Sequence, residues 1–235
     1  MCLSTSSLPM VIIKQTIKMS NLQNNMELRR LSAAPAEYRV ERVKREDGGE
    51  DVFISGYGAV FEQYSKPIWD EWVEIISRNA CDGCDMSDVV MVVDHGRDIG
   101  SVLARSRNGE GTLQITVDDN GIAFRFKAPN TTTANDLIEL IERGDITECS
   151  FAFWVAEDRW VYDMTFGDKT YDVRRIEKLG KLADLSIVVS GQYGQTSVSV
   201  EERAMVDKAR KAGKPTAQKR TMSVRLAKAI TDTLS

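Results

Sequence analysis

Residues 112–127 have the sequence TLQITVDDNGIAFRFK, which carries the strongest short-range structural signal in the chain. Apolar and polar residues alternate along residues 112–117 and again along residues 122–127, as in strands that bury one face. Between them, Asn120 and Gly121 favour a type I′ turn, because both residues adopt positive φ at low cost. The stretch therefore predicts an antiparallel β-hairpin.

A helix is predicted directly after this hairpin, over residues 131–144. The threonines of residues 131–133 offer an N-cap, and Gly144 is a typical C-terminal stop. The apolar residues of this stretch follow the spacing i, i+3, i+4 and i+7, which places them on one face of a helix. These residues are Ala134, Leu137, Ile138 and Ile141.

Most of the remaining chain is predicted to form short strands, with Gly56 and Gly58 as candidates for a bulge or bend. Residues 68–76 fit either a strand or a short helix. Strands and helices do not alternate strictly, so a doubly wound parallel sheet is disfavoured. We expect an α+β, mainly β fold with an antiparallel β-barrel-like or sandwich core and flanking helices. The other predicted strands cover residues 38–43, 51–61, 89–93, 100–106, 146–154, 170–176, 183–189 and 196–200.

Length and composition indicate one globular domain of moderate size with a tail at each end. The chain has 235 residues, of which 42% are hydrophobic and 28% charged. No run of about 18 apolar residues occurs, so we expect no transmembrane helix. We expect a disordered N-terminal extension over residues 1–36, a folded domain over residues 37–202 and a separate C-terminal tail over residues 203–235.

The C-terminal tail differs from the rest of the chain in charge. Residues 203–235 contain nine Lys or Arg and two Asp, a net charge of +7, whereas the whole chain carries −4. A basic segment of this kind can bind an acidic protein surface or nucleic acid, or remain a solvated, partly helical tail. The segment has no aromatic residue on which bases could stack, which disfavours single-stranded nucleic acid.

Two cysteines, Cys81 and Cys84, have the spacing of half a zinc site or of a redox pair. A structural zinc site needs about four ligands, and the chain has no second pair of this spacing. The surrounding pattern is not thioredoxin-like either. We therefore predict two small loop residues, and neither a metal site nor a cofactor.

Three residues are candidates for chemistry. His95 is the only histidine, and it follows the apolar run 89–93, where a buried strand opens into a loop. Ser150 lies within a predicted strand, where it either bonds locally or faces a site. Asp184 interrupts an apolar strand, so its carboxylate needs a partner such as an imidazole N–H, unless it lies at a strand edge in water.

In order and spacing these segments resemble the prohead (capsid maturation) protease family of tailed phages, which is similar in fold to the assemblin proteases of herpesviruses. The resemblance covers roughly residues 37–200. The histidine motif of the family corresponds to His95 with Ile99-Gly100, the nucleophile to Ser150 and the acid to Asp184. Two positions depart from the family pattern: Gly96 replaces a frequent Asp, and Ala152 replaces a usual Gly.

The resemblance implies a serine endopeptidase in which His95 is the general base, Ser150 the nucleophile and Asp184 the acid that orients the imidazole. It implies no metal or cofactor. It offers residues 100–101 and residues 174–175 as candidates for the oxyanion hole. The implied substrates are the major capsid protein or its scaffold segment and the chain itself, cut inside the prohead or in the host cytoplasm. It also implies a homodimer, and a basic tail that docks to scaffold and is later removed.

Two other functions remain open at this stage. The departures at Gly96 and Ala152 suggest a catalytically inactive capsid assembly or scaffolding factor with the same fold. The basic tail suggests a nucleic-acid-binding domain with a basic arm, which predicts steeply salt-dependent binding.

Overall fold

The computed structural model describes residues 26–31, 38–189 and 200–214 of the 235-residue chain. Its strands form two sheets, one of seven strands and one of four. The seven-stranded sheet has the order β1-β10-β11-β5-β6-β7, and β4 pairs with β11 beside β5. Its strands are β1 (Glu27–Leu31), β4 (Trp72–Ile76), β5 (Asp88–Val93), β6 (Val102–Arg107), β7 (Glu110–Gly111), β10 (Glu148–Phe166) and β11 (Lys169–Val188).

The four-stranded sheet has the order β2-β3-β9-β8 and is antiparallel throughout. Two α-helices and one 3-10 turn (Ile99–Ser101) complete the described fold, which is therefore mainly β. Of the two expected cores, barrel-like or sandwich, a closed barrel is not present among the described strands, which form two open sheets. The remaining elements are β2 (Arg39–Lys44), β3 (Glu50–Val60), β8 (Leu113–Val117), β9 (Gly121–Lys127), α1 (Thr132–Glu142) and α2 (Val200–Gly213).

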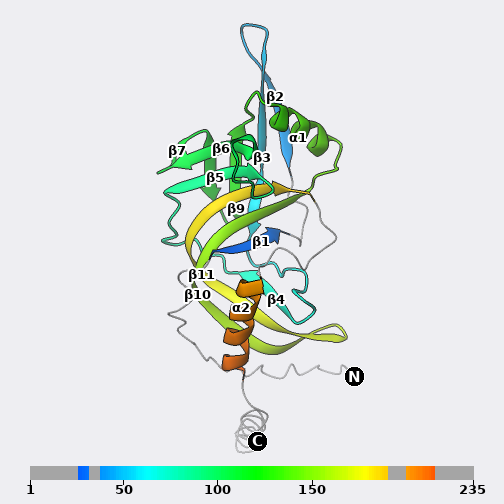
Figure 1. Cartoon of the computed structure of the whole chain (residues 1–235), viewed down its shortest axis with the longest axis vertical. Helices are drawn as coiled ribbons and strands as arrows, with labels where there is room; N and C mark the ends of the chain where they lie inside the picture. The colour runs from blue at the N-terminus through cyan, green and yellow to red at the C-terminus, as the bar shows by residue number, and fades with distance from the viewer. Residues whose placement is uncertain (1–25, 32–37, 190–199, 215–235) are drawn as a thin grey trace, which may run out of the picture.

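The long antiparallel hairpin of β10 and β11 forms the centre of the larger sheet. Figure 1 shows these two strands running from the region beside β5 to the end of the molecule that carries β4 and α2. Along β11, residues Asp172–Ile176 pair in parallel with β4, and Asp184–Ile187 pair in parallel with β5. The two strands predicted at residues 170–176 and 183–189 are thus one strand.

The strand continues through its polar middle because cross-strand charges pair there. Arg159 donates to Glu177 at 2.9 Å, and Lys178 donates to Glu157 at 3.1 Å. These residues interrupt the apolar pattern that marks a buried strand, which is why sequence periodicity predicted two short strands.

The predicted hairpin at residues 112–127 is confirmed as β8 and β9, but the prediction of a type I′ turn is wrong. Neither Asn120 nor Gly121 has a positive φ. Instead, the Asp118 carboxylate accepts hydrogen bonds from the N–H groups of Asn120 and Gly121 at 2.8 and 3.0 Å. Gly121 is needed for close approach, since a Cβ there would lie 2.0 Å from the carbonyl oxygen of Ala59 on β3.

The predicted helix is confirmed as α1, together with both of its ends. The Thr131 hydroxyl accepts from the N–H of Ala134 at 3.2 Å, and Gly144 has φ +78° just past the C-cap. The bulge predicted near Gly58 is also confirmed, by a register shift between Tyr57 and Ala59. The ambiguous residues 68–76 include β4, a strand.

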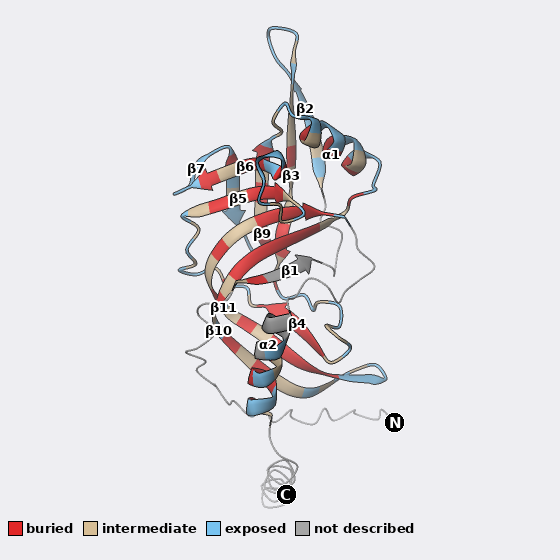
Figure 2. Ribbon diagram, viewed as in Figure 1, coloured by how far each residue is buried: buried red, intermediate tan, exposed pale blue. Residues whose placement is uncertain are grey.

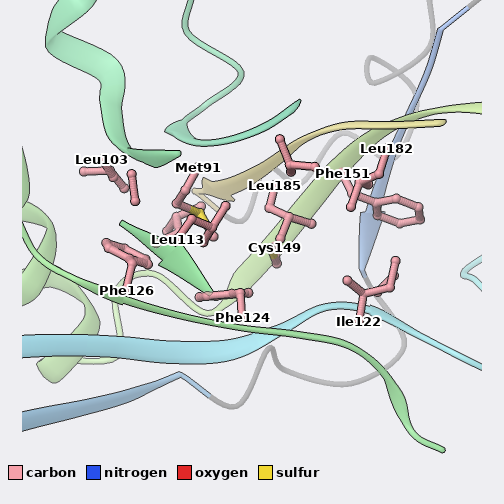
Figure 3. Close-up of a cluster of buried hydrophobic side chains, with 14 of the residues drawn as sticks. Met91, Leu103, Leu113, Ile122, Phe124, Phe126, Cys149, Phe151, Leu182 and Leu185 are labelled. Carbon is pink, nitrogen blue, oxygen red and sulfur yellow. The ribbon is translucent and has the colours of Figure 1, made fainter. Parts of the chain in front are cut away.

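The main core lies between the two sheets. In Figure 3, Phe151 and Cys149 of β10 and Leu185 of β11 gather with Ile122 and Phe124 of β9, and all of these residues are 3% exposed or less. Figure 2 shows buried residues along the middle of both sheets, with exposed residues in the turns, at strand ends and along β2. Because side chains alternate along a strand, Ser150 and Asp184 lie on the opposite face of the larger sheet from this core.

Two segments that were expected to be outside the domain belong to the fold. Glu27–Leu31, within the predicted disordered extension, forms β1 on the edge of β10. The predicted boundary at residue 202 falls inside α2, which packs Val206 against Trp72 and Trp160. Both contacts join residues far apart in sequence, which local patterns do not reveal. The rest of both predicted tails and the strand predicted at residues 196–200 lie outside the described residues, apart from Val200 at the start of α2.

Within the described residues, no helix combines the length and the apolar character that crossing a membrane requires.

A cluster of buried charges joins β1, β4, β10 and β11. The guanidinium of Arg174 is 0% exposed and donates to Glu27 at 2.6 and 2.9 Å, to Asp158 at 2.7 Å and to Glu74 at 3.1 Å. Three carboxylates thus share one cation away from water. A buried cluster of this kind depends above all on its single cation, which offsets the charge of all three carboxylates.

We predict that Arg174→Met lowers the free energy of unfolding by about 3–5 kcal/mol, because it removes the buried cation that three carboxylates share. Chemical denaturation of the two proteins measures this difference. The matched control is Arg143→Met, which removes an arginine whose side chain is 61% exposed and is expected to change stability by about 1 kcal/mol or less. A loss from Arg174→Met as small as that of the control would contradict the prediction.

Candidate active site

The structure brings together the three residues that the sequence singled out. His95 lies just after β5, Ser150 on β10 and Asp184 on β11, and these strands are neighbours in the order β10-β11-β5. The imidazole Nδ1 is 2.8 Å from Asp184 Oδ1, and Nε2 is 2.6 Å from Ser150 Oγ. Both distances are those of hydrogen bonds.

The partners of the ring determine where its proton lies. An ionised carboxylate can only accept, so Nδ1 carries the hydrogen and donates it to Asp184. Nε2 is then unprotonated and accepts from the Ser150 hydroxyl. In this arrangement a base is hydrogen-bonded to a hydroxyl on one side and oriented by an acid on the other.

The backbone around His95 is held in an unusual conformation. Asp94 and His95 have φ of +48° and +52°, in the left-handed region that residues other than glycine rarely adopt. Three hydrogen bonds hold this turn: Asp94 N–H to the Ile187 carbonyl at 3.0 Å, His95 N–H to Ser186 Oγ at 2.8 Å and Gly96 N–H to the Val93 carbonyl at 2.9 Å. Backbone strain of this kind is found at functional sites, where the surrounding structure over-determines it.

Ser186 is a site residue that the sequence analysis did not identify as a candidate. It is 0% exposed, lies directly opposite Ser150 in the β10–β11 ladder and binds the backbone of His95. A signal was present, because Ser186 is two residues from Asp184 and strand periodicity places both on one face. Nothing in the sequence, however, indicated that its partner would be a backbone amide 91 positions away.

The loop after His95 is closed by Asp98. Its side chain accepts from the N–H of Gly100 at 2.9 Å, and its carbonyl accepts from the N–H of Ser101 at 3.2 Å. Gly96 lies against the same turn, since a Cβ there would be 2.4 Å from the Cβ of Ser101. A larger residue at position 96 would therefore displace Ser101, which accounts for glycine in this chain.

The loop and the buried cluster also bear on the two oxyanion-hole candidates. The amides of Gly100 and Ser101 already donate to Asp98. Arg174 lies ten residues from Asp184 along β11, and its guanidinium is already bonded to Glu27, Asp158 and Glu74 in the buried cluster.

The three residues differ in their access to water. Ser150 is 0% exposed, whereas the side chains of His95 and Asp184 are 17% and 19% exposed. The imidazole and the carboxylate thus lie at the surface of the outer sheet face, while the hydroxyl is covered.

The cysteine pair has no metal-binding partners in the described part of the chain, where no group of three or more His, Cys, Asp or Glu could hold a metal ion. Burial raises the pKa of Cys81 to about 12 and that of Cys84 to about 11, so both thiols are protonated and weakly reactive near neutrality. Both lie outside the helices and strands, as predicted for two loop residues, and both pack against the main core.

Comparison with known proteins gives one family. The sequence profile described as Caudovirus prohead serine protease matches residues 38–211, which is more than half of the chain. No curated protein matches the chain significantly. Among solved structures, that of the bacteriophage T4 capsid assembly protease, gp21, aligns with 10% sequence identity and a TM-score of 0.44, over 72% of this chain and 100% of that chain.

We predict that the imidazole of His95 carries its proton on Nδ1, and that Asp184→Asn shifts the ring toward the Nε2-protonated tautomer. An amide can donate to Nδ1, which a carboxylate cannot do. Heteronuclear NMR reports the tautomer without ambiguity because the chain has one histidine.

The matched control is Asp94→Asn, one residue from the ring, at a left-handed position that asparagine tolerates. It is expected to leave the tautomer unchanged. An Nε2-protonated ring in the unmodified protein would contradict the hydrogen-bond assignment.

Proposed function

Because the chain belongs to the Caudovirus prohead serine protease family, we propose that His95, Ser150 and Asp184 are the catalytic triad of an endopeptidase that acts during phage capsid maturation. The observation that carries this proposal is the continuous hydrogen-bonded path from Asp184 through His95 to Ser150, with distances of 2.8 and 2.6 Å.

The proposed reaction is acyl transfer to Ser150. As the Ser150 oxygen attacks the scissile carbonyl carbon, Nε2 of His95 takes the hydroxyl proton. The tetrahedral intermediate collapses when the imidazolium returns that proton to the leaving amine, which frees one product and leaves an ester on Ser150. A water molecule, activated by the same nitrogen, then hydrolyses the ester and restores the serine.

Asp184 contributes by holding the ring and by stabilising its charged form. Its carboxylate accepts a hydrogen bond from Nδ1–H throughout and remains ionised, so the imidazolium that forms during each half-reaction is paired at once. The left-handed turn at Asp94 and His95 fixes the ring from the backbone side. Serine, base and acid are therefore positioned before substrate binds, which lowers the entropic cost of reaching the transition state.

For the substrates, we propose the major capsid protein or its scaffold segment and the chain itself, cut in the prohead interior or the host cytoplasm. Family membership supports this choice. We also propose a homodimer, which sedimentation of the purified protein would test, and a scaffold-docking role for the basic C-terminal segment of residues 203–235.

A second candidate is a catalytically inactive assembly factor with the same fold. Full burial of Ser150 favours this candidate, because a nucleophile must reach its substrate. The departure at Gly96 no longer favours it, since the close approach of Ser101 explains that glycine without loss of the triad.

Co-expression with the capsid protein precursor distinguishes the two candidates. We expect the unmodified chain to cleave the precursor and itself, and Ser150→Ala to reduce cleavage at least about 10³-fold, because the nucleophile is gone. Intact masses of both proteins measure the result. The matched control, Ser87→Ala in an exposed turn, is expected to cleave normally.

Equal cleavage by the unmodified chain and by Ser150→Ala would exclude Ser150 as the nucleophile. Normal assembly without cleavage in either protein would favour the assembly factor.

A further inference from the structure

The strand next to the nucleophile belongs to the N-terminus of the same chain. β1 runs antiparallel along the edge of β10, with Arg30 paired to Ser150 and Glu27 paired to Phe153. Opposite residues in an antiparallel pair have their Cα atoms about 4.5–5.5 Å apart. The backbone of β1 therefore lies within reach of the residue proposed to attack a peptide bond.

This edge of β10 would otherwise be open. Among the described strands, β10 pairs only with β11 on one side and β1 on the other. An unpaired strand edge binds extended peptides by main-chain hydrogen bonds, without strict demands on sequence. The edge of β10 that pairs with β1 thus has the properties of a binding site for an extended polypeptide.

β1 is attached in a way that allows it to leave. It is a five-residue edge strand, and its ion pair with the core is made by Glu27, three residues before Arg30. Arg174, the partner of Glu27, also binds Asp158 and Glu74. Release of Glu27 therefore leaves Arg174 with two carboxylates, so the buried cluster survives without β1.

We propose that β1 occupies, within the same chain, the edge of β10 on which an extended peptide substrate pairs, so that the site stays latent until β1 leaves. This inference rests on the proposed function of Ser150 as nucleophile. Because β1 is part of the same chain, it competes with a peptide substrate for the edge of β10 at a high effective concentration. The substrate gains access when β1 is displaced.

Three full-length variants test the proposal. Glu27→Lys places a cation beside Arg174 and releases the strand. Arg29→Pro and Arg30→Pro form a matched pair, because successive N–H groups along a strand point to opposite edges. One proline therefore removes a hydrogen bond to β10, and the other removes an N–H that points away from it. Glu41→Lys, at an exposed position on β2, controls for the change of charge.

The first readout is binding of a fluorescent peptide with the sequence of residues 26–31, MELRRL, followed by anisotropy. We expect binding to Glu27→Lys and to one proline variant, and binding at least about 10-fold weaker to the unmodified chain, to Glu41→Lys and to the other proline variant. This readout does not depend on catalysis. Equal binding by all five proteins, or binding by none, would overturn the proposal.

The second readout is the rate at which each purified protein cleaves the capsid protein precursor. We expect an increase of about 10-fold or more in the variants that bind the peptide. Peptide binding without cleavage in any variant would contradict the proposed protease function. It would still support the edge of β10 as a peptide-binding site. Cleavage at one rate in all five proteins would support the protease and overturn latency.

Discussion

The register between β10 and β11 is the constraint on which the site depends. It sets Ser150 opposite Ser186 and Ala152 opposite Asp184, so that Ser150, Asp184 and the Ser186 that holds the His95 backbone share one face of the sheet. A slip of one residue would move Asp184 into the core and Leu185 out of it. The apolar core on the other face, with Phe151 and Leu185 nearly or fully buried, therefore specifies the site indirectly.

Parallel pairing of β5 with β11 brings His95, the third candidate residue, to the same place as Ser150 and Asp184. Because Ile187 pairs with Val93, the chain leaves β5 beside the end of β11 and must turn at once to bring the imidazole back over the sheet. The left-handed conformation of Asp94 and His95 makes that turn, and hydrogen bonds from their N–H groups to the Ile187 carbonyl and the Ser186 hydroxyl hold it. The strain at His95 is thus a consequence of placing a base above the strands that carry the other two groups.

Sequence patterns predicted the parts of this structure whose causes are local. The hairpin at residues 112–127 and the capped helix α1 follow from alternation, from helical spacing and from Thr131 and Gly144. The three candidate site residues were identified partly from chemistry, since one histidine and one carboxylate in an apolar strand are unusual, and partly from resemblance to a family.

The features that sequence patterns did not predict are long-range. β1 pairs with a strand more than a hundred residues away, and the polar middle of β11 is stabilised by charges on β10 that no local window contains. The turn at Asn120-Gly121 was assigned to the wrong type because its glycine is required by contact with Ala59 and not by φ. Tertiary contact decided each of these cases.

The most direct test of a working triad is to map the serine that reacts with a fluorophosphonate. Such reagents modify serines whose hydroxyl is activated by a neighbouring base. After prolonged exposure, peptide mass spectrometry should locate the adduct on Ser150 in the unmodified protein and find none there in His95→Ala. An adduct that persists in His95→Ala, or a Ser150 that stays unmodified both in the unmodified protein and in the released variant Glu27→Lys, would contradict the assignment of Ser150 as a nucleophile activated by His95.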